Sequence, residues 1–307
     1  MAESSPSRPE KDEAHERGPW AFVTRRLRPL PDGGHLVATS RRHRKGLRPH
    51  RVPDLESAAS PPPATASAFR HPWAPRRLAW WIAVLFAIGS ALFMIGGVAA
   101  TWPGSVPAPL GEVSVLNRIF VVGAVFFTSA AWLQWLEALN RDVAHALDNG
   151  APRRWRWFGW RPRNLGYLAS AVQLVGTVMF NFNTIDATFA GLSWEAEDLA
   201  VWTPNMVGCV CFLVASYLAY VEVSQGLASF EPRCISWWVT VVNLLGSVAF
   251  QISAFYSFVG PGPAATGSLF FASFYTAAGG LFFLTGSYLM IPELFDEQEE
   301  SDASTSG

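Results

Sequence analysis

The chain has 307 residues, of which 50% are apolar, 14% aromatic and only 15% charged. Soluble domains carry about 25% charged residues, so this composition indicates a membrane protein and excludes a collagen, a coiled coil, a disulfide scaffold and a wholly disordered chain. The 23 basic residues face 24 acidic ones, and no nucleic-acid partner is expected from that balance.

Residues 1–74 are expected to form a disordered, basic cytoplasmic tail. The stretch up to residue 77 holds 15 basic and eight acidic residues, and it is too poor in apolar side chains to bury a core. Its most basic part is Arg41-Arg42-His43-Arg44-Lys45, followed by Arg48 and Arg51. This segment predicts contact with anionic lipid headgroups, and the alternative is a solvated tail that only enforces topology.

Six apolar runs follow, each about as long as the ~20 residues that a helix needs to cross a bilayer. They cover residues 78–100, 115–137, 165–188, 199–222, 236–259 and 269–291, and Pro204 is expected to kink the fourth. We therefore predict an all-α membrane bundle of six transmembrane helices.

The basic residues also predict the orientation of the bundle. They gather in the N-terminal tail and in a basic loop at 140–161, whereas the first, third and fifth connections hold none. Because positive residues stay on the cytoplasmic side, we expect a multi-pass protein of the cell membrane with both termini in the cytoplasm, ending in an acidic tail at 294–307.

Two sequence patterns each occur three times along the chain. The pattern P-R-x12-G-[ST]-x-x-F recurs in the odd-numbered spans, and in the even-numbered spans a Gly precedes a Phe by four residues and a Glu by 14. The odd-span glycines are Gly89, Gly176 and Gly246, and the even-span glycines are Gly123, Gly208 and Gly279. The patterns predict three tandem hairpin repeats at 75–139, 162–225 and 226–293, arranged in parallel about an axis along the membrane normal.

The spacing of these patterns predicts which residues meet within a hairpin. At about 1.5 Å per residue, the distances from Arg to Gly and from Gly to Glu are nearly equal, so the two glycines lie level and allow close helix packing. The same register predicts three ion pairs: Arg76 with Glu137, Arg163 with Glu222 and Arg233 with Glu293. Each is worth about 0–1 kcal/mol at an interface, and the alternative is three solvated charges at headgroup level.

The third repeat carries a family resemblance. Its Trp237-Trp238 entry, its Asn243, Gly246, Ser247 and Phe250, and its exit from Gly286 to Glu293 resemble YrhK-like domain membrane proteins, with the best match over residues 232–293. The first two copies fit more loosely, because Phe86 and Gln173 replace Asn243. The resemblance implies a helical-hairpin membrane domain of unestablished biochemistry and supplies no catalytic residues.

Polar residues inside the spans are the best functional candidates, because they are costly in lipid unless they face the bundle interior. Gln173 and Asn243 share one repeat position, and Asn181 and Gln251 share another, about 140° away around the helix. The patterns of catalytic, metal and cofactor sites are missing, and none of these sites is expected. The favoured function is therefore a non-enzymatic protein that organises or senses the membrane or serves in a larger complex; the alternative is a small-solute transporter or channel.

Overall fold

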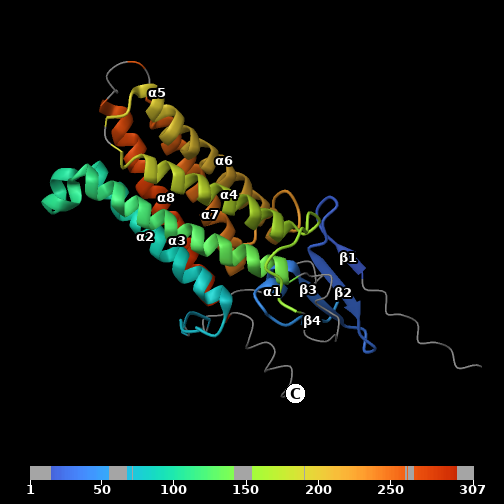
Figure 1. The fold of residues 1–307 in the computed structure, drawn as a ribbon. Helices are drawn as coiled ribbons and strands as arrows, with labels where there is room; N and C mark the ends of the chain where they lie inside the picture. The colour runs from blue at the N-terminus through green and yellow to red at the C-terminus, as the bar shows by residue number, and fades with distance from the viewer. Residues whose placement is uncertain are drawn as a thin grey trace, which may run out of the picture.

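The computed structural model describes residues 15–54, 68–70, 72–141, 154–189, 191–259, 261 and 266–295. Within these ranges a small antiparallel sheet lies at one end of a bundle of long helices (Figure 1). We call this end of the bundle the sheet end and the opposite one the far end.

Six helices are long and apolar enough to cross a membrane. They are α2 (Leu78–Thr101), α3 (Val113–Asn140), α4 (Leu165–Asp186), α6 (Thr203–Ser224), α7 (Ile235–Tyr256) and α8 (Thr266–Glu293). The short helix α5 (Trp194–Glu197) and a π-helical turn (Asp198–Trp202) run directly into α6. Pro204 lies in the first turn of α6, where its missing N–H costs no helical hydrogen bond.

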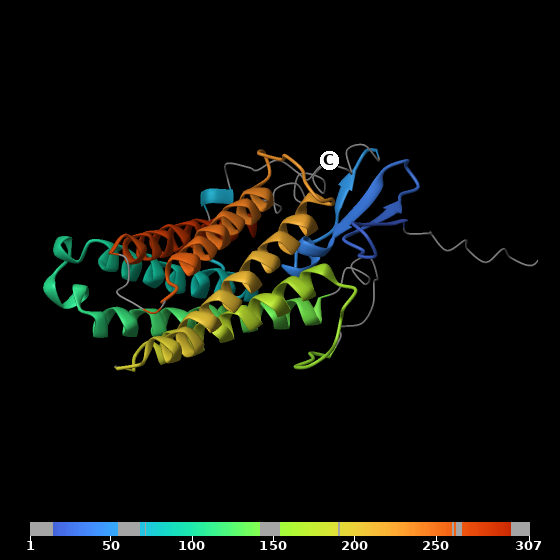
Figure 2. The same ribbon diagram turned by 90° about the horizontal axis from the view of Figure 1, so that it is seen from above.

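The six helices form a closed ring. Each packs against its neighbours along the chain, and α8 returns to pack against α2 (Figures 1 and 2). Glycines permit this closure: a methyl group on Gly97 would lie 2.5 Å from the backbone nitrogen of Ala277, and one on Gly280 would lie 2.5 Å from that of Met94. The ends of the ring thus meet through backbone contact that any larger residue would prevent.

Six phenylalanines, one from each helix, fill the centre of the ring, and we call them the phenylalanine core. Phe93, Phe180 and Phe250 form one triangle with ring centroids 5.7–6.1 Å apart. Phe127, Phe212 and Phe283 form a second triangle at 5.7–6.0 Å. Within each helix pair the two rings lie 5.0–5.4 Å apart, so the two triangles are stacked on one another.

The aligned glycines also face each other in three helix pairs. A methyl group on the first glycine of a pair would lie 3.0–3.3 Å from the carbonyl oxygen of the second. The pairs are Gly89 with Gly123, Gly176 with Gly208, and Gly246 with Gly279. The close approach lets the neighbouring phenylalanines turn inward, because each even-helix glycine packs directly against the ring of the motif Phe on the partner helix.

The sheet corrects the expectation of a disordered tail, at least for residues 15–54. Strands β1 (His15–Arg17), β2 (Arg25–Pro29), β3 (His35–Thr39) and β4 (His50–Val52) pair in sequence order, and α1 (Ser40–Arg44) lies between β3 and β4. The remainder of the expected tail lies largely outside the described residues. A small apolar cluster of Leu27, Val37 and Val52 lies within the sheet, and Thr24, just before β2, joins it to the bundle by donating a 2.6 Å hydrogen bond to Gln225.

Candidate functional site

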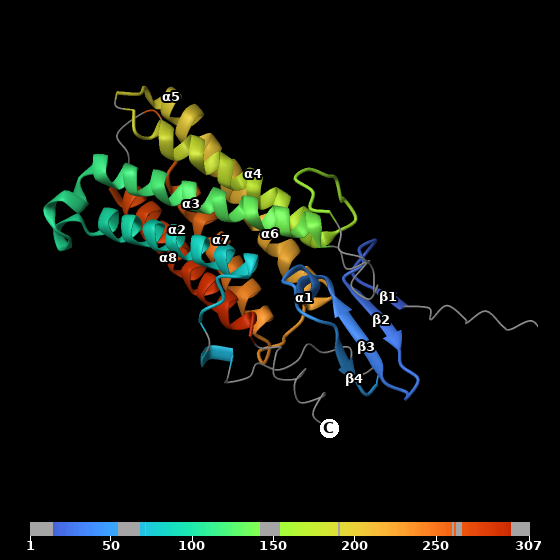
Figure 3. The same ribbon diagram turned by 60° about the horizontal axis from the view of Figure 1, so that its bottom comes forward.

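The candidate site is built around α1, which lies between the sheet and the adjacent end of the helix ring (Figure 3). Thr39 caps this helix by accepting a hydrogen bond from the backbone N–H of Arg42. Arg41, Arg44 and Lys45 follow at spacings of i, i+3 and i+4, which places all three cations on one face of the helix turn. That face meets Glu137, Glu222 and Glu293, the carboxylates at the ends of α3, α6 and α8, each at most 5% exposed. We call these six residues the charge cluster.

Glu222 binds α1 through both of its carboxylate oxygens. Arg44 donates two hydrogen bonds of 2.9 Å, one to each oxygen, and the hydroxyl of Ser40 donates a third at 2.6 Å. The side chains of Arg44 and Glu222 are 8% and 0% exposed, so this is a buried, bidentate ion pair.

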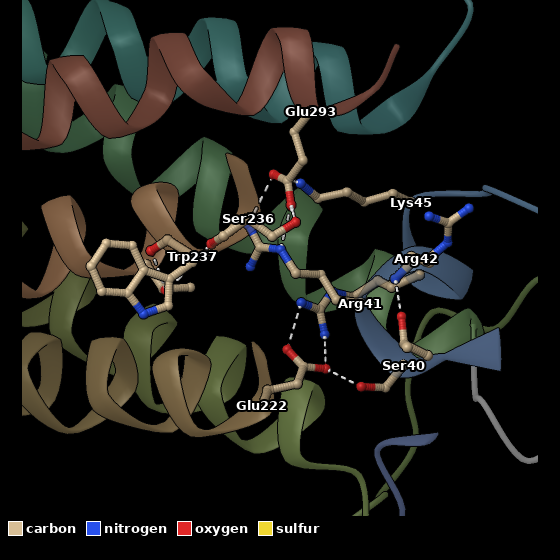
Figure 4. Close-up of polar contacts among 11 residues, drawn as sticks. Ser40, Arg41, Arg42, Lys45, Glu222, Ser236, Trp237 and Glu293 are labelled. Carbon is tan, nitrogen blue, oxygen red and sulfur yellow. Dashed lines mark hydrogen bonds and ion pairs between the residues drawn. The ribbon is translucent and has the colours of Figure 1, made fainter. Parts of the chain in front are cut away.

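Glu293 collects three donors (Figure 4). Arg41 donates through Nε at 2.5 Å and through Nη2 at 2.9 Å, the hydroxyl of Ser236 donates at 2.5 Å, and Lys45 forms an ion pair with the second oxygen. Because Ser236 lies in the first turn of α7 and Glu293 ends α8, this carboxylate joins two helices of the ring to α1. Glu137 is buried beside Arg44 and Lys45 without a direct bond to either, and it interacts with them electrostatically.

Burial and pairing act against each other on the cations of α1. Burial and the neighbouring Arg41 lower the pKa of Lys45 to about 8, and Glu293 only partly opposes this shift. Burial also acts to lower the pKa of Arg41, but the carboxylate of Glu293 outweighs it and the pKa is raised. Arg41 therefore holds the permanent positive charge next to Glu293, while Lys45 is the cation that gives up its proton first.

The structure corrects the three predicted ion pairs. Arg76, Arg163 and Arg233 are exposed, and in the described part of the chain none of them pairs with its predicted carboxylate. Glu222 and Glu293 instead bind cations from a segment that was expected to be disordered. The spacing places the arginines and the carboxylates at the same level along the bundle axis. The arginines, however, lie on the outside of the ring and the carboxylates on the inside. The sequence signal for the true partner was the i, i+3, i+4 run of cations in Arg41–Lys45.

Much of the basic segment is engaged in contacts within the protein. Arg42, Arg44 and Lys45 are buried and Arg41 is bound to Glu293, so the continuous run of cations faces protein. Arg48 and Arg51 remain exposed.

A polar cavity lies between the charge cluster and the phenylalanine core, and we call it the near cavity. It measures ≈60 Å³, and all six helices of the ring line it, with Arg41 of α1 at its sheet end. Gln173 and Asn243 both line it, and Gln134 donates a 3.3 Å hydrogen bond to Gln173. Phe86, at the equivalent position of the first helix pair, lines it too.

The other two candidate amides lie elsewhere. Asn181 donates a 2.7 Å hydrogen bond to the hydroxyl of Thr128, and so joins α4 to α3. The amide nitrogen of Gln251 contacts the sulfur of Met206 on α6. Neither residue lines the near cavity. The four amides therefore divide as their positions around the helices imply, one pair facing the axis and one pair lying between helices.

A second cavity, the far cavity, lies on the other side of the phenylalanine core. It measures ≈170 Å³, and it is also lined by all six helices. Asn183, which the sequence places toward this end of its span, lines it together with Asn117 and Asn205, which sequence reasoning passed over. Because each cavity touches every helix of the ring, both lie on the axis of the ring.

Comparison with known proteins adds no relative: the chain matches no family model, no curated protein and no solved structure. Among the residues described, no group of three or more His, Cys, Asp or Glu side chains is placed to hold a metal ion.

Proposed function

We propose that the chain consists of three tandem hairpin repeats arranged around one axis. The support is the phenylalanine core, in which equivalent residues of the three helix pairs form two triangles. The first and third pairs also begin alike, since Trp81 donates to the carbonyl of Pro75 and Trp238 to that of Pro232, each six residues earlier. The resemblance to YrhK-like domains belongs to the same proposal, with the third pair as its best representative.

We place the protein in the cell membrane with the sheet end in the cytoplasm. The distribution of Lys and Arg along the connections supports this orientation. In this orientation α1 and the charge cluster lie at the cytoplasmic face, and the far cavity lies in the opposite half of the membrane.

The function we propose is a gated, non-enzymatic conduit for a small polar solute. One observation carries it: two cavities with polar side chains in their walls follow one another on the axis of a closed helix ring, and a cation of α1 lines the inner one. Polar groups in a membrane interior are costly, and they mark solute paths when they face a shared cavity. Two barriers interrupt this path. One is the phenylalanine core between the cavities, and the other is α1 at the cytoplasmic opening of the ring, which we call the mouth.

A flux measurement tests the conduit. The purified protein is reconstituted in liposomes, and the uptake of glycerol or urea is followed by light scattering. We expect Asn243→Leu, which makes the wall of the near cavity apolar, to slow the flux. Gln251→Leu is the matched control, because it replaces an intramembrane amide on the same helix outside that cavity.

The second candidate is a protein that organises or senses the membrane, or that serves in a larger complex. The observation that favours it is the phenylalanine core, which fills the axis with aromatic side chains packed as in a rigid scaffold. To decide between the two, flux is also measured in a variant in which Arg41, Arg44 and Lys45 are replaced by Gln to free the mouth. Absence of flux in both this variant and the wild type would leave the second candidate.

A further inference from the structure

The far cavity has one apolar and one polar side. The triangle of Phe93, Phe180 and Phe250 forms its floor, and amide and hydroxyl groups form much of its wall. No Asp, Glu, Lys, Arg or His is among its lining residues. An ion entering it would have no buried counter-charge, and the cost of removing an ion from water would therefore be largely uncompensated.

The three asparagines in the wall each use their amide nitrogen within the protein. Asn117 donates to the carbonyl of Ala187 at 2.5 Å, Asn183 donates to that of Val201 at 2.8 Å, and Asn205 donates to the hydroxyl of Ser257 at 3.3 Å. Each bond uses one of the two amide N–H groups, so each asparagine keeps its oxygen as an acceptor and a second N–H as a donor. The Oδ1 of Asn205 has a 3.8 Å contact with the thiol of Cys209. The wall therefore suits a ligand that both donates and accepts hydrogen bonds, as a hydroxyl group does.

The volume limits the size of such a ligand. An apolar cavity of about 150 Å³ holds one benzene molecule, which has about six non-hydrogen atoms. The far cavity, at ≈170 Å³, admits a molecule of the same size. A short polyol meets all three conditions, because its C–H groups rest on the phenylalanine floor and its hydroxyls donate to the amide oxygens.

We propose that the far cavity is a binding site for a small, uncharged, hydroxyl-bearing molecule of the short-polyol class. The site deepens the proposed function by naming the class of solute. It rests on that function only in taking the bound molecule to be the solute that is transported. Binding itself is measured without transport.

Cys209 provides a reporter in the cavity wall. It is 1% exposed and lines the far cavity, and Ala at positions 211 and 234 leaves it as the only cysteine of the chain. The experiment follows the modification of Cys209 by methyl methanethiosulfonate, an uncharged reagent of similar size, at increasing glycerol concentrations. We expect glycerol to slow the reaction saturably. A second variant that retains only Cys211, on the same helix but outside the cavity lining, controls for viscosity and general solvent effects.

A matched pair of substitutions tests the polar wall. Asn183→Leu removes one acceptor from the cavity, and we expect it to raise the glycerol concentration for half-protection about 2–10-fold, the range of one hydrogen bond. Asn181→Leu, two residues earlier on α4 and outside the cavity, should leave that concentration unchanged. If Asn183→Leu fails to fold, Asn117→Leu makes the same test from α3.

Two results would overturn the site: no saturable protection of Cys209 by glycerol, or equal protection by toluene. Equal effects of the Asn181 and Asn183 substitutions would overturn it as well. The outcome is separate from that of the flux assay. Protection without flux keeps the site and removes the conduit, whereas flux without saturable protection keeps the conduit and removes the site.

Discussion

The buried pair of Arg44 and Glu222 gives the sharpest test of how α1 is held. The two side chains are 8% and 0% exposed and share two hydrogen bonds of 2.9 Å. Opposite charges about 4 Å apart attract by about 4 kcal/mol at an effective dielectric constant of about 20. Removing one partner also leaves the other charge buried and unpaired, and this typically costs about 3–5 kcal/mol.

We therefore expect Glu222→Gln and Arg44→Met each to lower the free energy of unfolding by about 3–5 kcal/mol. The double variant buries no unpaired charge at this position, so it should lose at least about 2 kcal/mol less than the sum of the single variants. The assay is a denaturant titration in detergent micelles, followed by circular dichroism. Protease sensitivity of residues 15–54 reports in parallel whether α1 has left the mouth of the ring.

The exposed pair of Arg51 and Asp32 is the matched control. Its side chains are 57% and 47% exposed, so Asp32→Asn should cost no more than about 1 kcal/mol. Two results would refute the reasoning: single-variant effects that add within about 0.5 kcal/mol in the double variant, or a loss in Asp32→Asn as large as that in Glu222→Gln. Either would mean that the pair at the mouth of the ring holds α1 no more strongly than a surface contact does.

Three further predictions concern stability, measured by the same titration. Burial lowers the pKa of Lys45 from an ordinary 10.5 to about 8, so between these two pH values the unfolded chain holds more protons than the folded one. The free energy of unfolding should therefore rise with pH across this window by up to about 3 kcal/mol, and Lys45→Met should abolish the rise. Phe212→Ala, in the fully buried phenylalanine core, should cost about 3–5 kcal/mol, whereas Phe182→Ala, at a residue 54% exposed, should cost under about 1 kcal/mol. Gly97→Ala should cost at least about 1–3 kcal/mol by forcing α2 from α8, and the same change at Gly104, which has open space around it, should be nearly neutral.

Much of the bundle could be predicted because its signals are local and periodic. Runs of apolar residues locate the six long helices to within a few residues, and the nearly equal Arg-to-Gly and Gly-to-Glu spacings predict which glycines lie level. In lipid, backbone hydrogen bonds must be satisfied within each helix, so hydrophobic length alone is a strong constraint. The angle of Gln173 and Asn243 around their helices also indicated that they share a face.

The sheet was missed because its evidence is spread over short segments. Strands of three to five residues enclose only a small apolar cluster, and composition therefore favoured disorder. The available signal was Pro31-Asp32-Gly33-Gly34 between two short runs, where Gly33 has a φ of +86° that suits a tight hairpin turn. The partners of the carboxylates could not follow from spacing, because they are about 180 to 250 residues away in sequence.

The charge cluster brings acids from three helices of the ring against cations from one short segment. Glu137, Glu222 and Glu293 lie near the sheet-end termini of α3, α6 and α8, so three like charges would repel one another there if α1 were absent. The side chains of α1 bond directly to two of these carboxylates, Glu222 and Glu293. The third, Glu137, interacts with α1 only at longer range, so the three carboxylates do not offer α1 the same contacts. This difference favours one orientation of α1, and of the sheet attached to it, on the ring.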